Sequence, residues 1–495
     1  MSARPVFILR LAMRSGVLAA ASLLGACAVI RAPEVTLSAP ATPPAWQVIQ
    51  PARLDLQTDT GAANDAANNL AGWWQALHDP ALNKLLQAVL ANNPSMQSSG
   101  ISYRLAELKA GVVNAGYGPK ANAGISSSQS SPLGESGHSS SHSLSLSASW
   151  ELDLWGARSA QRQQAQASVL RAGQEVRAAQ VSLLAETVQA YISLRIAQAN
   201  QQLAAQTIEL RAQSHDLVRW EYQAGLKTEL EQNQALTLLR QAEAVAPQHE
   251  QSRLLALQQL AALLGGESTE ALKPLAEPGA IPEFQGPQSL RIPADVLRQR
   301  PDVLAQELAV QEQAQSVALA RISRLPSFGL SGSIGTSSDL FADIFDVDAA
   351  VARLAGSLSA LLFDGGVQRS NVKQSRLLLD QALLAYRSKL LTAQQEVEAA
   401  LTQLETARRQ QLSYQQALDA AEQAAELALF QYDAGLLDFS DLLTTQTALI
   451  SARSSLLGNR STILGSWIQL YRSLGGGWQN LPLPATAFAM GDTNE

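Results

Sequence analysis

The chain has 495 residues, enough for two to four domains and a sizeable hydrophobic core. Its formal net charge of −7 comes without any concentrated stripe of lysine and arginine, which argues against a nucleic-acid-binding protein. Only 5% of the residues are aromatic, and alanine, glutamine, leucine and serine dominate, a bias that favours long helices with closely approaching backbones.

The first 26 residues resemble a bacterial lipoprotein signal peptide. Three arginines precede the short apolar run GVLAAASLLGA, and Leu24-Gly25-Ala26-Cys27 completes the pattern. We therefore expect residues 1–26 to be removed and Cys27 to carry lipid at the start of a segment spanning 27–79. The alternatives are a buried thiol or an ordinary secretory signal. No aspartate follows Cys27, so nothing there resembles an inner-membrane retention signal, and a lipid anchor in the outer membrane is expected.

The rest of the chain repeats itself after about 207–210 residues. The matching pairs are Asn93-Pro94 with Arg300-Pro301, Pro119 with Pro326, Gly156 with Gly365, Gly225 with Gly435, and Gly265-Gly266 with Gly475-Gly476. This pattern indicates a tandem duplication. Repeat 1 spans 80–266, a Pro/Gly-rich linker spans 267–290, repeat 2 spans 291–476, and a C-terminal tail spans 477–495.

Each repeat changes its hydrophobic period in the same order. From Pro80 to about Ala115 the apolar residues recur at helical spacing. They are Leu82, Leu85, Leu86 and Val89. After Pro119 the stretch HSLSLSASW alternates, with Leu146 on one face and Ser147 on the other, and FGLSGSIG and LAGSLSALL do the same in repeat 2. Each repeat thus predicts two strands of the kind that touch lipid on one face and water on the other, although a half-buried soluble hairpin would look alike.

A long helix is predicted after each strand pair, with apolar residues seven apart, as is typical of coiled coils. These residues are Ile196, Leu203, Leu210 and Leu217 in repeat 1, and Leu383, Leu390, Val397 and Leu404 in repeat 2. The shorter helices before the strands and near the end of each repeat together match the length of the long one. We expect them to stack end to end beside it, with Pro247 as the candidate position for a kink. No other stretch is apolar enough for a membrane helix, so a membrane-crossing part would have to consist of strands.

Two phrases of the form Tyr-x-Ala-Gly-Leu interrupt the long helical patterns. The first contains Tyr222 and Gly225, and the second contains Tyr432 and Gly435. Glycine supplies the positive φ that lets a chain double back, and a tyrosine can pack the turn while its hydroxyl bonds across it. Each phrase therefore predicts the turn of a helical hairpin.

Further phrases stand at fixed places in this order. They are WWQALHDPALNKLL near the start, LRQRPDV opening repeat 2, and SWELDLWGARSAQ and LLFDGG at the strand-to-helix junctions. Together with the two turns they resemble TolC-type outer-membrane efflux proteins, in the NodT-like lipoprotein branch. The resemblance implies a mostly α fold with a small β part. In it, a homotrimer closes a 12-stranded β-barrel in the outer membrane, four strands per chain, and forms a long coiled-coil α-helical barrel across the periplasm. A bilayer-spanning sheet of four strands would in any case need partners to close its edges.

The resemblance also implies that the two turns form the periplasmic tip, where polar residues beyond the glycine constrict the duct. The implied tip and gate residues are Tyr222, Gly225, Lys227, Glu229 and Glu231 in repeat 1, and Tyr432, Gly435, Asp438, Ser440 and Asp441 in repeat 2. Ser440 replaces a common leucine, Thr444 a common aspartate and Leu437 an arginine, so the narrowest ring is not identified. Alternatively, the acids only complement helix dipoles.

The sequence offers no pattern for enzymatic chemistry, and we expect neither catalysis nor a cofactor apart from lipid on Cys27. No catalytic triad, phosphate loop or dinucleotide fingerprint stands in the right context. His138 and His142 flank serines at an expected exposed hairpin tip, which favours a loop over a metal site. Asp79 is expected to cap the helix that begins at Pro80, and Trp73-Trp74 to pack rather than bind a ligand.

These features favour a passive exit duct of a tripartite efflux system, with an inner-membrane pump, a periplasmic adaptor and outer-membrane lipid as partners. One alternative is a non-conducting, lipid-anchored periplasmic scaffold, in which the alternating segments would be loops. Another is a duct dedicated to metal-ion or type I protein export. The duct is favoured over the scaffold because a scaffold has no need for the same alternating segments in both repeats. The sequence does not indicate the transported substrate.

Overall fold

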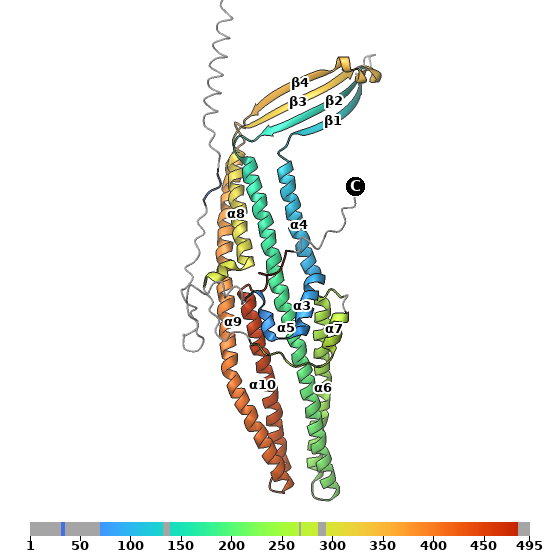
Figure 1. Cartoon of the computed structure of the whole chain (residues 1–495), viewed down its shortest axis with the longest axis vertical. Coiled ribbons are helices and arrows are strands. Elements are labelled where there is room, and N and C mark those ends of the chain that lie inside the picture. The colour runs from blue at the N-terminus through green and yellow to red at the C-terminus, as the bar shows by residue number, and fades with distance from the viewer. Residues whose placement is uncertain (1–30, 35–69, 132–138, 267–268, 286–293, 484–495) are drawn as a thin grey trace, which may run out of the picture. The chain divides into compact units, whose positions relative to one another are not determined.

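The computed structural model describes residues 31–34, 70–131, 139–266, 269–285 and 294–483. Cys27 and His138 lie outside these residues, so lipidation of Cys27 stays a prediction. The described chain is mostly helical and contains one four-stranded sheet (Figure 1). It divides into two compact units, of which the first is formed mainly by Arg104–Arg171 and Gln306–Tyr386, and the second by most of the remainder. Each unit takes segments from both predicted repeats.

The sheet of the first unit contains two strands from each repeat, as predicted. Its strands are β1 (Lys120–Ser130), β2 (Ser139–Leu152), β3 (Ser327–Ser338) and β4 (Val351–Ser359), all antiparallel and in chain order. They have 11, 14, 12 and 9 residues, so each reaches the length of about 9–11 residues that a tilted membrane-spanning strand needs. In this chain β1 and β4 form the two edges of the sheet, each with a neighbour on one side.

The register places apolar residues on one face of the sheet and serines on the other. Leu146 pairs with Ala123 on β1 and Ile334 on β3, and its side chain is 52% exposed. Ser147, on the opposite face, pairs with Asn122 and Ser333. The alternation predicted for HSLSLSASW is therefore confirmed across the sheet.

The connection between β3 and β4 folds back onto the apolar face of the sheet. Its short helix η3 (Phe341–Phe345) contains the buried Ile344, whose carbonyl accepts a hydrogen bond from Thr336 on β3. The ring of His142 meets Phe341 edge-on, with centroids 5.5 Å apart. His142 was expected in an exposed loop, but it lies within β2 with this aromatic neighbour, because β2 extends further than its leucine–serine core suggests.

Two helices of 67 residues each, α5 (Ala157–Gln223) and α9 (Val367–Asp433), follow the strand pairs. In α9 the predicted heptad positions Leu390, Val397 and Leu404 are buried. In α5 the predicted positions are only half-buried, and Arg211, Ser214 and Val218 occupy the buried seam instead. The prediction failed there because two of these buried positions are polar. No helix in the part of the chain described here is both long and apolar enough to cross a membrane.

In the second unit the shorter helices of repeat 1 meet end to end, as predicted. The expected helix from Pro80 to Ala115 is two helices, α3 (Pro80–Asn92) and α4 (Pro94–Ala115), because Pro94 forces Asn93 into an extended conformation. The Asn93 amide donates to the carbonyl of Leu263, the last residue of α6 (Glu229–Leu263), at 2.9 Å. Asn93 thereby satisfies a helix-end carbonyl that would otherwise lack a partner. The helix α6 continues through Pro247 without a break.

The second junction uses a charged residue at the equivalent position. Arg300 precedes α8 (Pro301–Ile322), and its guanidinium donates to the carbonyl of Ser473, the last residue of α10 (Phe439–Ser473), at 2.6 Å. Its Nη2 donates to Asp302 and Glu396, each at 2.8 Å, and its Nε donates to Asp302 at 3.0 Å. The buried guanidinium is thus neutralised by two carboxylates while it holds the junction.

Residues near the chain's start and in the expected linker pack onto the helices of the second unit. Asp79 caps α3, as predicted, by accepting hydrogen bonds from the backbones of Ala81 and Leu82. The Trp73 ring is buried and stacks on Tyr471 at 5.2 Å, so it packs, as expected. The expected linker 267–290 contains a helix, α7 (Thr269–Ala276), and Phe284 stacks on Trp467 at 4.3 Å.

The charge cluster around Arg300 generates a pH-dependent prediction. Burial raises the pKa of Asp302, but the opposing effect of Arg300 and Lys389 is larger and lowers that pKa from 3.8 to about 2. The ionised carboxylate therefore stabilises the fold fully at pH values above 3.8, and this stabilisation is lost as the pH falls toward 2. We expect Asp302→Asn to lower the free energy of unfolding by about 1–2 kcal/mol at neutral pH, and the difference to vanish in acid.

Thermal unfolding of the detergent-solubilised protein, followed by far-UV circular dichroism, measures this effect. Asp380→Asn, at an exposed position of α9, is the matched control and should change little. A difference between Asp302→Asn and the parent that persists at acid pH would contradict the charge-based account.

Candidate functional site at the two helical turns

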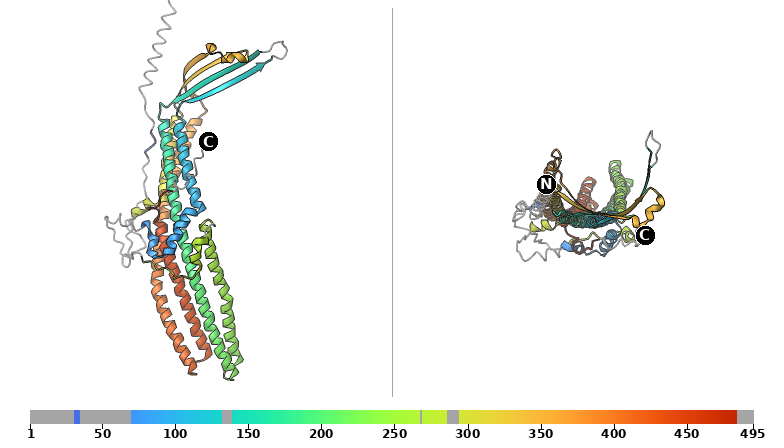
Figure 2. Two further views of the ribbon diagram at one scale, coloured as in Figure 1. Left: turned by 45° about the vertical axis from the view of Figure 1, so that its right-hand side comes forward. Right: turned by 90° about the horizontal axis from the view of Figure 1, so that it is seen from above.

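The two Tyr-x-Ala-Gly-Leu phrases form the turns of two helical hairpins, α5–α6 and α9–α10, which lie side by side in the second unit (Figures 1 and 2). Gly225 and Gly435 have φ angles of +77° and +70°. In both turns the glycine N–H donates to the tyrosine carbonyl at 2.9 Å, and the following leucine N–H donates five residues back at 2.8 Å. This is the Schellman arrangement, which closes a helix end with backbone bonds and a left-handed residue. The predicted role of the glycines is confirmed.

The two tyrosines are equivalent in sequence but differ in structure. Tyr432 is 5% exposed and donates its hydroxyl proton to the carboxylate of Glu221 on α5, at 2.5 Å. The bond joins one hairpin to the other. Burial and the neighbouring Glu221 raise the pKa of Tyr432 well above its ordinary value. Tyr222 is 40% exposed, so the packing role predicted for both tyrosines holds only for Tyr432.

Lys227 and Glu231 contact each other just beyond the first turn. Thr228 is the N-cap of α6, and Glu231 completes a capping box, with its carboxylate 2.9 Å from the Thr228 backbone nitrogen. The same carboxylate lies 3.3 Å from Lys227 Nζ, which in turn sits 4.9 Å from the centre of the Tyr432 ring. The hydrogen bond from the Thr228 backbone lowers the pKa of Glu231 despite a small opposing effect of burial.

The acidic side chains beyond the second turn are more exposed to solvent than that of Glu231. Asp438 is the N-cap residue of α10, but its side chain makes no capping bond. Ser440 and Asp441 are exposed in the first turn of that helix. In repeat 1, Glu231 is therefore bonded to Lys227 and Thr228. In repeat 2, the equivalent Asp441 is exposed to solvent.

A buried core lies behind the turns and contains a polar link between the hairpins. The core consists of Val218, Ala235, Ala428, Tyr432, Phe439, Leu442 and Leu443. Further along α5, the buried Arg211 donates to the side chains of Gln446 at 3.1 Å and Thr447 at 2.8 Å. Burial lowers the pKa of Arg211. The hairpins thus share apolar packing at the turns and hydrogen bonds above them.

Large apolar side chains surround the turns on the outside. They are Trp220, Leu226, Leu230, Phe430 and Leu436, each exposed by 61–79%. Their number within so short a region marks a surface suited to contact with another protein.

Several of the contacting residues were not singled out from the sequence. Glu221 lies directly before Tyr222, but no local pattern predicts its bond to a residue in the other repeat. The same holds for Arg211 and Gln446, which meet across 235 positions. Thr228 was predictable, because Thr-x-x-Glu before a helix is the capping-box pattern.

Comparison with known proteins agrees with this architecture. The sequence matches the family described as "Outer membrane efflux protein" over residues 85–266 and 292–476, most of the chain. The chain belongs to the outer membrane efflux protein family. The fold class and the efflux function expected from the sequence are those of this family, and so is its outer-membrane location.

Individual relatives extend the match over nearly the whole chain. The pyoverdine export outer membrane protein OpmQ of Pseudomonas aeruginosa is 29% identical over 94% of this chain and 96% of its own length. The outer membrane protein OprJ of the same organism is 30% identical over 90% of this chain and 94% of its own length. The solved outer-membrane channel OprN has a TM-score of 0.77 and 26% identity, covering 91% of this chain and 98% of that structure.

The difference between the two tyrosines gives a matched pair of substitutions. Tyr432→Phe keeps the ring but removes the hydrogen bond to Glu221, leaving a carboxylate without its donor, so we expect a loss of about 1–3 kcal/mol in stability. Tyr222→Phe should change stability little. Thermal unfolding and amide hydrogen exchange in residues 221–231 and 431–441 measure both effects. Equal exchange rates in the two variants would show that the Tyr432 bond does not hold the hairpins together.

Proposed function

We propose that this efflux family member acts as a homotrimer that forms a passive duct through the outer membrane, anchored additionally by lipid on Cys27. The observation that carries the proposal is the four-stranded sheet with one apolar face, one serine face and two open edges. In hydrocarbon every backbone polar group needs a partner, so the edge strands β1 and β4 require neighbours from other copies. Three copies would supply twelve strands and close the ring.

The helices beside the two edge strands support the same assembly. The helix α4 leads into β1 and exposes Leu105, Leu108 and Val112, each by 50–71%. The helix α9 follows β4 and exposes Leu377 and Leu384 by 68% and 66%. Two different apolar surfaces, one at each edge, suit a head-to-tail contact that repeats around a closed ring.

The exposed apolar residues around the turns support partners at the tip. We propose that a periplasmic adaptor contacts this surface and connects the duct to an inner-membrane pump that supplies the energy. Relatives are named for antibiotic efflux, toluene efflux and pyoverdine export at 29% identity in each case. Such different cargoes at equal similarity fit a duct whose substrate is selected by its partners, and the duct itself performs no covalent chemistry.

The scaffold alternative required the alternating segments to be loops. They are paired strands with a consistent apolar face, which favours the duct. No residue of the described chain favours metal-ion or type I protein export over the other cargoes.

The faces of the sheet provide the first test. Leu146→Arg would direct a charge toward hydrocarbon at a cost of about 2–4 kcal/mol near the bilayer midplane, whereas Ser147→Arg would face water. We expect Leu146→Arg to reduce the yield of heat-resistant trimers in outer membranes sharply and Ser147→Arg to leave it nearly unchanged. Equal yields from the two variants would contradict a membrane-spanning sheet.

The acids at the turns provide the second test. We propose that Asp441 and Glu231 gather near the threefold axis and favour cations electrostatically. Asp441→Ala combined with Glu231→Ala removes these charges and shortens both side chains, which would widen the constriction. We expect higher single-channel conductance in planar bilayers and a weaker cation preference. Asp419→Asn, at an exposed site of α9, is the control.

Unchanged conductance and selectivity in assembled trimers of the double variant would place the constriction elsewhere. Asp438 and Ser440 would then be the next positions to substitute, because both are exposed at the start of α10.

A further inference from the structure

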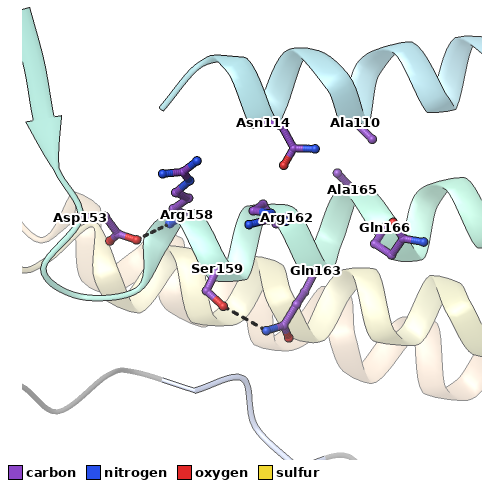
Figure 3. A pocket seen from close by; sticks show the side chains of 9 residues that line it. All are labelled: Ala110, Asn114, Asp153, Arg158, Ser159, Arg162, Gln163, Ala165 and Gln166. Atoms are coloured by element: carbon purple, nitrogen blue, oxygen red, sulfur yellow. Dashed lines mark hydrogen bonds between the residues drawn. The ribbon is translucent and has the colours of Figure 1, made fainter. Parts of the chain in front are cut away.

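A cavity of about 640 Å³ lies between the end of α4 and the first turns of α5 (Figure 3). Two arginines, Arg158 and Arg162, line it from α5, one helical turn apart, so both can reach the same ligand. Asn114 extends from α4 on the opposite wall, and Gln166 adds a further amide group, whereas the Gln163 amide is hydrogen-bonded to Ser159 and Gln315. The cavity is thus lined by hydrogen-bond donors around two cations.

The charge of the cavity is not cancelled by its one carboxylate. Asp153 accepts hydrogen bonds from the backbone nitrogens of Gly156, Ala157 and Arg158 at 2.7–2.9 Å, so both of its oxygens cap the start of α5. In the part of the chain that the structure describes, neither Arg158 nor Arg162 takes part in a salt bridge. The guanidinium of Arg158 lies 5.8 Å from the centre of the Tyr117 ring. The lining thus holds two positive charges and one negative charge, and the negative group is already hydrogen-bonded to the helix backbone. This balance makes the cavity suited to an anion.

The cavity lies where the sheet meets the helices. The strand β2 ends at Leu152, next to Asp153, and α5 begins at Ala157. Residues 153–156 connect the strand to α5, and a helix rises 1.5 Å per residue, so Arg158 lies about 1.5 Å and Arg162 about 7.5 Å along α5 from its first residue. The headgroup layer on each side of a bilayer is about 5–8 Å thick. If β2 spans the hydrocarbon, Arg158 therefore lies near headgroup depth, and the long side chain of Arg162, one helical turn further along, can reach back toward that layer.

Charged residues elsewhere in the first unit distinguish the two ends of the sheet. Bases gather in the chain at the end where the helices join it, whereas four aspartates lie in the β3–β4 connection at the other end. The bases are Lys120, Arg158, Arg162, Arg321, Arg324 and Arg369, and the aspartates are Asp339, Asp343, Asp346 and Asp348. The helical end also holds three acids, Glu151, Asp153 and Asp364, but these are fewer than its six bases, whereas residues 339–350 contain no base. The helical end is therefore the one that favours an anionic headgroup.

We propose that the cavity lined by Arg158 and Arg162 binds the phosphate of an anionic phospholipid headgroup in the periplasmic leaflet of the outer membrane. The proposal rests on the proposed function, because the strands must span the bilayer for the cavity to reach the headgroups. Two guanidinium groups on one helix face can donate to a single phosphate. Trp150, which donates to the Tyr117 carbonyl at 3.1 Å, adds the aromatic group typical of a membrane interface.

Lipid-dependent thermal stability of the full-length trimer in neutral detergent tests the proposal. Dioleoylphosphatidylglycerol should raise the unfolding midpoint of the parent protein more than dioleoylphosphatidylcholine does. A basic residue at an anionic surface changes affinity about fivefold, so Arg158→Gln with Arg162→Gln should require about 30-fold more phosphatidylglycerol for half of the effect. Arg240→Gln, an exposed arginine of α6, is the matched control and should leave the titration unchanged.

A second pair of variants keeps both arginines in place. Asn114→Glu introduces a carboxylate opposite them and should abolish the phosphatidylglycerol effect, whereas Asn114→Gln should retain it. Inorganic phosphate at the same phosphorus concentration should not raise the midpoint. A rise as large as with lipid would overturn a phospholipid site in favour of a free-anion site.

Channel recordings separate this proposal from the proposed function. If the double arginine variant conducts normally in planar bilayers and its phosphatidylglycerol titration matches the parent, the lipid site is overturned and the duct stands. If the parent trimer does not conduct at all, the duct itself is overturned.

Discussion

The two open edges of the sheet are the constraint on which the rest of the structure depends. One side of β1 and one side of β4 carry backbone groups that this chain alone does not pair. In water these groups would be solvated, but in hydrocarbon each unpaired group costs several kcal/mol. The apolar face of the sheet, with Leu146 and Ile334 exposed, favours the hydrocarbon. Association with other copies then follows from the sheet's own chemistry, and the exposed leucines of α4 and α9 offer apolar surface beside both edge strands.

The duplicated halves share a backbone plan but differ in the chemistry that holds it. At the helix junctions a neutral amide, that of Asn93, does in repeat 1 what the charged group of Arg300 does in repeat 2. At the turns, Tyr432 is buried and bonded to Glu221, whereas Tyr222 remains exposed. The backbone hydrogen bonds at the two turns and at the ends of α6 and α10 are the same in both halves, so the differences at these places lie in the side chains. The two halves therefore share an architecture, but different side-chain contacts hold their hairpins.

Much of the fold could be predicted from the sequence because its signals are local. Alternation of period two marks strands such as β2, and glycine after tyrosine and alanine marks both turns. Features that depend on distant residues could not be predicted. The seam of α5 contains Arg211 and Ser214 because their partner Gln446 lies on the other hairpin, and no apolar pattern identifies polar seam residues. The break at Asn93 was visible in Pro94, but it was obscured by apolar residues that continue at helical spacing on both sides.

The closure of both turns by backbone bonds alone has a consequence for how such ducts diversify. A Schellman turn needs a glycine with positive φ and two backbone hydrogen bonds, and it uses none of the atoms of the leucine side chain that follows. Leu226 and Leu436 are 74% and 79% exposed, so we expect a substitution at either position to leave the turn geometry intact. The tip can therefore acquire a different set of contacts through single substitutions without passing through an unstable intermediate. The surface of the tip can in this way diverge among members of the family while the turns themselves stay the same.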